Sequence, residues 1–225
     1  MAVLVWDGAG GTPTTPGDGR RPDTVTEMSG DPDDDTGPIR TFTPVAPHER
    51  PVRHRRTARV LLVDDSERLL LLSDSDPGLP GSRWWITPGG GVEAGESDRA
   101  TAVRELAEET GARIVEANLV GPIAVRRVCH GYTDVIVAQD ETFFAVRLPA
   151  FEVDIAGHTE EELLTMTDHR WWARQELATT GEPVWPHNIL ALWDEFDARL
   201  DDARRPPLDL GSVEESSVPT NCRTC

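Results

Sequence analysis

Residues 90 to 112 read GGVEAGESDRATAVRELAEETGA, and this stretch decides the fold. Its fixed points are two glycines, four glutamates and one arginine: Gly90, Glu96, Arg104, Glu105, Glu108, Glu109 and Gly111. Ser97 is a favourable N-cap, Asp98 suits the first turn of a helix, and Gly111 is a natural C-terminal stop. The spacing therefore predicts a helix over residues 98 to 110.

The predicted helix has two unlike faces when each residue turns it by about 100°. One face is aliphatic and suits packing on a sheet: Ala100, Val103, Leu106 and Ala107. The opposite face carries Arg104, Glu105, Glu108 and Glu109. Carboxylates four residues apart repel by roughly a few tenths of a kcal/mol. A divalent cation between them would reverse the sign, and hard oxygen ligands suit Mg²⁺, with Mn²⁺ as an alternative.

A glycine-rich turn precedes this helix. Residues 84–87, WWIT, have the aromatic and β-branched character of a strand, and residues 88–91, PGGG, break it. Glycines there let the backbone approach a ligand closely. A solvated acidic face would explain the helix alone, but a strand, a glycine turn, Glu96 and an acidic helix in succession favour a ligand site.

The same spacing resembles the Nudix box, the signature of metal-dependent hydrolases of nucleoside diphosphates linked to another group. Every charged and glycine position of the box is present, and only Ala112 departs from it, where the family usually carries a larger aliphatic residue. A looser resemblance covers about residues 55 to 200. It implies an α/β fold, an α/β/α sandwich with a mixed β-sheet, and a small nucleotide-type substrate.

The rest of the chain agrees with such a fold. Residues 58–63 and 68–73 form an expected hairpin, whose continuous apolar runs predict strands covered on both faces. Further strands are expected near residues 113–128 and 133–147 and at residues 169–173, and a last helix over about residues 186–202.

The ends of the chain differ in composition from the middle. Residues 1–50 are rich in Gly, Pro, Thr and Asp and poor in aliphatic residues, so they cannot bury enough apolar surface to offset the entropy of ordering. Residues 204–225 begin with a charged and proline-rich run. Both are predicted to be disordered, which leaves residues 51–203 as the Nudix-like domain.

Composition limits the partners. The net charge is −18 and no basic face is evident, which argues against binding to duplex nucleic acid. No apolar stretch is long enough to span a membrane, and the N-terminus lacks the features of a signal peptide. A cytoplasmic location is therefore expected, and a homodimer is left open.

The resemblance also assigns the chemistry. Metal ligands are expected at Glu105, Glu108 and Glu109, with the carbonyl of Gly90 as an additional ligand, while Arg104 orients a carboxylate of the box. Glu96 either braces the turn or joins the metal set, with bracing preferred. The general base is either a glutamate of the box, Glu108 or Glu109, or one supplied by a downstream loop, the acidic run of residues 160–162, for which Glu162 is the candidate.

Substrate contacts are expected from Arg59, Trp85, Gly89 and Gly90. Adjacent strand residues point to opposite faces, so one residue of the pair at 84 and 85 is expected in the core and the other can stack on a base or ribose, with core packing as the alternative for either. The substrate itself is left open, because neither Pro122 nor Tyr132 lies where the family's subfamily patterns would place a proline or tyrosine. Two alternatives remain beside the hydrolase. One is a non-catalytic sensor of a nucleotide or ADP-ribose on the same fold. The other is an isomerase-type relative, for which Cys129 would supply the required cysteine.

Overall fold

The computed structural model describes residues 40–221. The strands are β1 Val52–Asp64, β2 Arg68–Asp74, β3 Trp84–Ile86, β4 Gly89–Gly91, β5 Val120–Gly131, β6 Ile136–Leu148, β7 Asp168–Ala173, β8 Val184–Trp185 and β9 Leu208–Glu214. The helices are α1 Asp98–Thr110, α2 Glu160–Thr165, α3 Arg174–Thr179 and α4 Ile189–Asp201, with a 3₁₀ turn η1 at Glu116–Asn118. Within these residues, no helix has the length and apolar character needed to cross a membrane.

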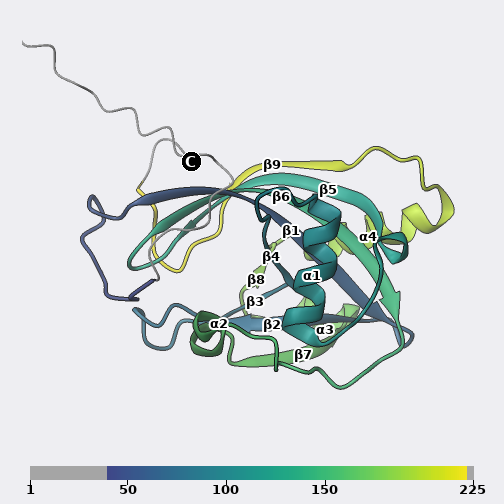
Figure 1. Cartoon of the computed structure of the whole chain (residues 1–225), viewed down its shortest axis with the longest axis horizontal. Coiled ribbons are helices and arrows are strands. Elements are labelled where there is room, and N and C mark those ends of the chain that lie inside the picture. The colour runs from purple at the N-terminus through teal and green to yellow at the C-terminus, as the bar shows by residue number, and fades with distance from the viewer. Residues whose placement is uncertain (1–39, 222–225) are drawn as a thin grey trace, which may run out of the picture. The chain divides into compact units, whose positions relative to one another are not determined.

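The strands form one mixed sheet, in the order β8-β3-β2-β1-β6-β5-β9 (Figure 1). β1 is its centre, parallel to β6 over its whole length and antiparallel to β2. Two further strands pair off this path, β4 with β1 and β7 with β2. The middle of β1, residues 57–59, therefore contacts the glycine strand β4 directly, and this contact fixes the position of the turn before α1.

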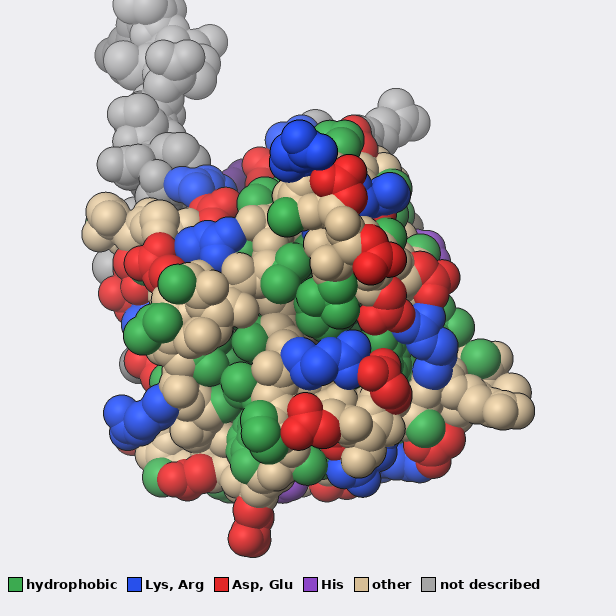
Figure 2. All heavy atoms as spheres, turned by 90° about the vertical axis from the view of Figure 1, so that its right-hand side faces the viewer, with side chains coloured by type: hydrophobic (Ala, Val, Ile, Leu, Met, Phe, Trp, Pro, Cys, Tyr) green, Lys and Arg blue, Asp and Glu red, His purple; other side chains and the backbone are tan. Residues whose placement is uncertain are grey.

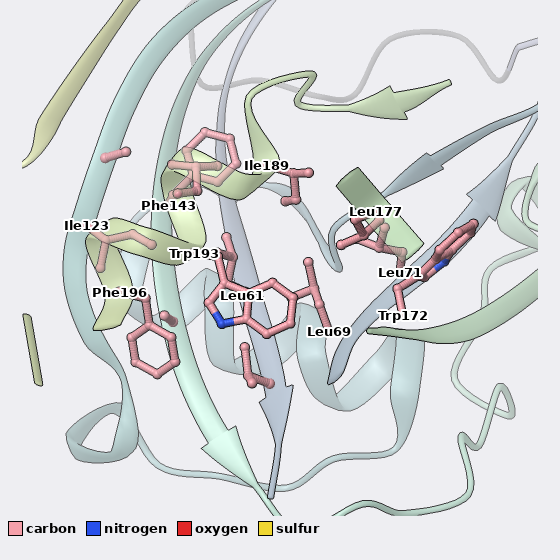
Figure 3. Packing of buried hydrophobic residues seen from close by; sticks show 14 of the residues in the cluster. Leu61, Leu69, Leu71, Ile123, Phe143, Trp172, Leu177, Ile189, Trp193 and Phe196 are labelled. Carbon is pink, nitrogen blue, oxygen red and sulfur yellow. The ribbon is translucent and has the colours of Figure 1, made fainter. Parts of the chain in front are cut away.

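Side chains on the two sides of the sheet enter different cores because successive strand residues point to opposite faces. In β1, Ala58, Val60 and Leu62 pack with Leu106 of α1. Leu61 and Val63 pack instead with α3 and α4, and Figure 3 shows Trp193 and Phe196 of α4 together with Leu61 and Leu69. The predicted α/β/α sandwich with strands covered on both faces is confirmed.

The box helix and the hairpin also match the prediction. Ser97 caps α1 by accepting a hydrogen bond from the amide of Ala100, and Gly111 ends it in the left-handed conformation at φ 77°. The deviating Ala112 is buried in the core beside Leu106 and Leu119, so the smaller side chain is accommodated.

The strand expected near residues 113–128 begins later, at Val120. The residues before it form a loop that includes η1, and Arg99 of α1 holds this loop by donating to the carbonyls of Glu116 and Leu119. Hydrogen bonds from a side chain of the preceding helix thus hold this loop in place of strand pairing.

The structure describes the inner part of each predicted tail, and both parts make contacts with the domain. Residues 40–50 are ordered by polar contacts: Arg40 pairs with Asp134 at 2.7 Å, and Arg50 donates to the carbonyls of Tyr132 and Pro219. Residues 1–39 and 222–225 lie outside the described part of the chain.

At the other end, β9 pairs in parallel with β5 and forms the outer strand of the sheet (Figure 1). None of its residues is fully buried. Backbone pairing and ion pairs, such as that of Arg205 with Glu195, hold this segment in place of apolar burial. A prediction from apolar composition alone therefore missed it.

Candidate active site

The carboxylates of α1 face the glycine strand. Glu109 is only 1% exposed and accepts a hydrogen bond from the amide of Gly89 at 2.7 Å. The carboxylate of Glu105 lies so close to Gly90 that a Cβ there would stand 2.4 Å from its Oε1. Position 90 thus requires glycine, because any side chain would displace this carboxylate.

Arg104 organises the box. Its Nε and Nη2 donate to the two carboxylate oxygens of Glu96, each at 2.9 Å, and Nη1 donates to Glu105 at 2.9 Å and Glu108 at 3.1 Å. Nη2 also reaches the carbonyl of Gly91. Arg104 therefore orients box carboxylates through a bidentate pair, as predicted.

Glu96 braces the turn. Besides Arg104, its carboxylate accepts from the hydroxyl of Thr101 and the amide of Glu93. The hydrogen bonds from Arg104 lower the pKa of Glu96 to about 2. Both oxygens of the Glu96 carboxylate thus accept hydrogen bonds from within the protein, in agreement with the structural role preferred from the sequence.

Glu162 of α2 joins the two buried box carboxylates. Ligand oxygens of Glu105, Glu109 and Glu162 lie within 4.8 Å of one another. Glu108 lies outside this acidic trio: its side chain is 47% exposed and contacts Arg104. The downstream acidic run therefore contributes one residue to the site, and it does so from a short helix where the sequence suggested a loop.

The segment before α2 is fixed against the C-terminal end of α1. The amide of Asp154 donates to the carbonyl of Thr110, and the ring Nε2 of His158 contacts the carbonyl of Glu109 at 3.0 Å. Gly157 lies directly on α1, where an added Cβ would be 2.5 Å from the carbonyl oxygen of Glu108. Thr159 then caps α2, and these contacts bring Glu162 to the trio.

The acidic trio has more negative charge than its neighbours balance. Burial raises the pKa of Glu105, although the charge of Arg104 opposes it. Burial, followed by the charge of Glu105, raises the pKa of Glu109 well above its usual value. Three carboxylates gathered in one place, two of them buried, form the oxygen donor set that hard divalent cations favour. These residues therefore fit a metal ion.

Three of the residues expected to contact substrate have other roles in this structure. Trp85 is 2% exposed, lies in the core against Trp172 and donates to Glu182 at 2.7 Å, so it offers no free ring face. The amide of Gly89 is used by Glu109 and its carbonyl by Arg59. Arg59 is further bound to Glu141 and to the carbonyl of Thr87. For Trp85 the expectation is wrong, because both residues of the tryptophan pair are core residues.

A polar group on the far side of Gly89 was missed by the sequence analysis. Arg126, His130 and Glu141 of β5 and β6 line, with Arg59, a cavity of about 10 Å³. Glu141 pairs with Arg126 at 2.6 Å, and nearby positive charges, Arg126 first, hold its pKa down at about 2 against the effect of burial. The sequence feature that could have identified this group is the presence of charged or ionisable residues, such as Arg126 and Glu141, within strands that are otherwise largely apolar.

Cys129, required by the isomerase alternative, lies buried on β5 and is disulfide-bonded. A disulfide sulfur is not the free thiol that this alternative needs. The structure therefore does not support it.

Comparisons with known proteins identify the family of this chain. The NUDIX domain model matches residues 53–192. Among curated proteins, the chain is 43% identical over 67 residues to an uncharacterized Nudix hydrolase, YvcI, of Bacillus subtilis, covering 30% of this chain and 38% of that protein. It is 30% identical over 124 residues to an RNA pyrophosphohydrolase of Roseobacter denitrificans, covering 52% of this chain and 76% of that protein.

Solved structures give weaker similarity. The MutT protein of Methanosarcina mazei is 20% identical, with a TM-score of 0.46 over 68% of this chain and 99% of that chain. A Caenorhabditis elegans Ap4A hydrolase is 18% identical, with a TM-score of 0.42 over 65% of this chain and 98% of that chain.

Proposed function

The chain belongs to the Nudix family of hydrolases, and we propose that it hydrolyses a phosphoanhydride bond in a nucleoside diphosphate linked to another group, with Mg²⁺ as its metal and Mn²⁺ as a substitute. The observation that carries the proposal is the acidic trio, whose three carboxylates converge within 4.8 Å beside the glycine strand. A purely structural helix face would gain nothing from holding two of these charges out of water.

Each residue of the site has a separate task in this proposal. Glu105, Glu109 and Glu162 hold the metal, with the carbonyl of Gly90 beside them. When bound, the metal neutralises the diphosphate charge and lowers the pKa of a water. Arg104 keeps Glu105 in place and Glu108 near the trio.

Glu108 is the proposed general base. It is the one box carboxylate near the trio that remains half exposed, so it can accept a proton from a water in the site and pass it to solvent. Glu162, named from the sequence as the downstream candidate for the base, is assigned to the metal because its oxygen lies with those of Glu105 and Glu109.

The substrate class follows from the family and from charge. The similarity to an RNA pyrophosphohydrolase makes a 5′-triphosphorylated RNA one substrate to test. Against RNA stands the net charge of −18. On the face drawn in Figure 2, acidic and basic side chains are interleaved, with no continuous basic patch. We therefore place small nucleotide derivatives first.

The test is hydrolysis across a substrate panel: ADP-ribose, nucleoside triphosphates, dinucleoside polyphosphates, sugar nucleotides and a 5′-triphosphorylated RNA. Each is assayed with Mg²⁺, with Mn²⁺ and with EDTA. Glu109→Gln and Glu162→Gln are expected to lower kcat by at least about 10²-fold, since metal-site charge stabilisation contributes several kcal/mol.

Glu160→Gln is the matched control, because it removes the same charge from the exposed start of α2 and is expected to retain activity. Turnover in EDTA, or equal losses for Glu160→Gln and Glu162→Gln, would reject the proposed site. If a panel member binds but none is hydrolysed, the non-catalytic sensor becomes the better account.

A further inference from the structure

A carboxylate of the chain's own C-terminal segment occupies a site with the chemistry of an anion pocket. Oε1 of Glu215 accepts from the main-chain amide of His187 and from its ring Nδ1, both at 2.8 Å. Oε2 lies 2.9 Å from Nη1 of Arg126. A main-chain amide and a ring N–H donate to one oxygen, and a buried guanidinium lies at ion-pair distance from the other. The same groups also bind a phosphoryl group.

Glu215 contributes to the balance of charge around Arg126. Arg126 and Arg59 share one carboxylate, that of Glu141, through distances of 2.6 and 3.3 Å. Glu215 supplies the second negative charge. Without it, a buried arginine would be left partly unpaired, which is strongly unfavourable in a protein interior. If this segment leaves, another anion has to replace its carboxylate.

The position adjoins the acidic trio. Arg126 and Arg59 line the cavity of about 10 Å³, which has room for roughly one water. Arg59 donates to the carbonyl of Gly89, and the amide of the same residue donates to Glu109. One glycine therefore separates the metal-binding carboxylates from the arginine-lined cavity. The cavity as it stands is too small for a phosphate.

Residues 214–220, which we term the C-terminal strap, are held mainly by polar contacts. The amides of Ser217 and Val218 donate to the carbonyl of Gly131, and the hydroxyl of Ser217 donates to Asp76. His187, which covers the outer side of Glu215, has a side chain that is 62% exposed. An anion from solvent therefore has a short path to the pocket, and the strap leaves little apolar surface behind.

We propose that Arg126 and His187 form a second anion site beside the metal-binding carboxylates, that Glu215 fills it in the free protein, and that a phosphoryl group of the substrate displaces the carboxylate and loosens the C-terminal strap. The role of the substrate rests on the proposed function. The anion site itself does not, since any phosphoryl anion presents the same acceptors.

The test is binding of inorganic pyrophosphate to the full chain in EDTA, where no metal links the ligand to the acidic trio and no turnover is needed. Glu215→Gln is expected to bind pyrophosphate about tenfold more tightly than wild type, because a competing charged hydrogen-bond acceptor has been removed. Glu214→Gln is the matched control: it removes the same charge one residue away from Glu215. Its amide oxygen can still accept from the amide of Thr220 and the hydroxyl of Ser216, so the strap keeps these contacts and the variant is expected to bind like wild type.

Two further variants separate binding from folding. In the Glu215→Gln background, Arg126→Lys should retain pyrophosphate binding and Arg126→Gln should lose it. His187→Ala, at an exposed side chain, should weaken the same binding several-fold without unfolding the protein. Amide exchange at Ser217 and Val218 in wild type should accelerate when pyrophosphate is added.

Equal affinity in the Glu214→Gln and Glu215→Gln variants, or amide exchange in the strap that pyrophosphate leaves unchanged, would overturn the proposal. The contact of Glu215 with Arg126 would then be a structural ion pair only.

Hydrolysis assays then distinguish a phosphoryl group of the substrate from a free anion as the ligand of the second site. If the second site serves the substrate, Glu215→Gln also lowers KM for the nucleotide that is turned over. If KM stays unchanged while pyrophosphate binds, the site accepts free anions and the part of the proposal concerning substrate fails. Loss of hydrolysis with anion binding intact rejects the proposed function alone.

Discussion

At the scale of single residues, Arg104 is the group on which the site's geometry depends most. One planar guanidinium contacts three carboxylates and a main-chain carbonyl. A lysine keeps the charge but has no fixed fork with which to bind both oxygens of Glu96. Arg104→Lys should therefore weaken Mg²⁺ binding and lower activity by about 10- to 100-fold, as loss of groups that orient metal ligands usually does.

The measurement is kcat against Mg²⁺ concentration for Arg104→Lys and for Arg113→Lys, the same substitution at an exposed position just past the end of α1. Arg113→Lys should match wild type. If the two variants behave alike, the bidentate pair with Glu96 has no role in metal binding.

His130 gives the protein a pH dependence that is independent of the metal. Burial lowers the pKa of His130 to about 4, and its Nδ1 lies 2.6 Å from the carbonyl oxygen of Glu215, so the neutral ring donates there. As pH falls below about 6.5, the unfolded chain takes up a proton that the folded chain refuses until about pH 4. The contribution of His130 to folding stability should therefore fall by about 3 kcal/mol across this window.

This loss can be measured by urea unfolding at pH 7 and pH 5. His130→Asn keeps a donor near the carbonyl of Glu215 but cannot take up the proton. Its free energy of unfolding should change less between the two pH values than that of wild type. Equal changes would show that another group is responsible.

At the scale of elements, the parts with local signals were predictable. The caps at Ser97 and Gly111 fixed both ends of α1, and the apolar runs around residues 64–67 identified the hairpin of β1 and β2. Trp85 was assigned to substrate because alternation along a strand suggests one buried face. In this sheet both faces are covered at this position. The two tryptophans still point to opposite faces, but both are buried.

The elements without local signals were missed. The strand β9 depends on the free edge of β5, and the start of β5 depends on Arg99 of α1. The helix α2 has six residues, too few for a periodic pattern, and was expected as an acidic loop. Such elements are specified by contacts between residues that are far apart in the sequence. Local sequence patterns do not reveal these contacts.

The position of α2 rests on a glycine rather than on its own sequence. Gly157→Ala should push the segment before α2 away from α1, because a Cβ would stand 2.5 Å from the backbone oxygen of Glu108. Glu162 would move with it, so activity should fall by at least about tenfold, and stability should fall by about 1–3 kcal/mol from overpacking. Kinetics and urea unfolding measure the two effects.

Gly181→Ala is the control, since a Cβ there meets nothing within 4 Å. It should change stability by no more than about 0.5 kcal/mol. Full activity in Gly157→Ala would mean that the placement of Glu162 tolerates a shift of the loop, and would weaken its assignment to the metal.

At the scale of the whole molecule, the site is assembled from both halves of the chain. The box supplies Glu105 and Glu109, α2 supplies Glu162, and the strap closes the adjoining pocket with Glu215. A domain boundary drawn at residue 203 would keep the first two parts and discard the third. The C-terminal segment thus belongs to the folded unit, although its composition resembles a tail.

A chain that ends at Ala203 tests this directly. It lacks the strand that covers the edge of β5 and leaves Arg126 without Glu215. It should therefore be less stable than the full chain by at least about 3 kcal/mol, since breaking a buried ion pair alone costs about 3–5 kcal/mol. Because the vacated site still carries its arginine, pyrophosphate should raise the free energy of unfolding of the shortened chain more than that of the full chain. Urea unfolding in EDTA, with and without pyrophosphate, measures both effects. Undiminished stability of the shortened chain would restore the boundary at residue 203, and equal stabilisation of the two chains would mean that Glu215 does not compete with the anion.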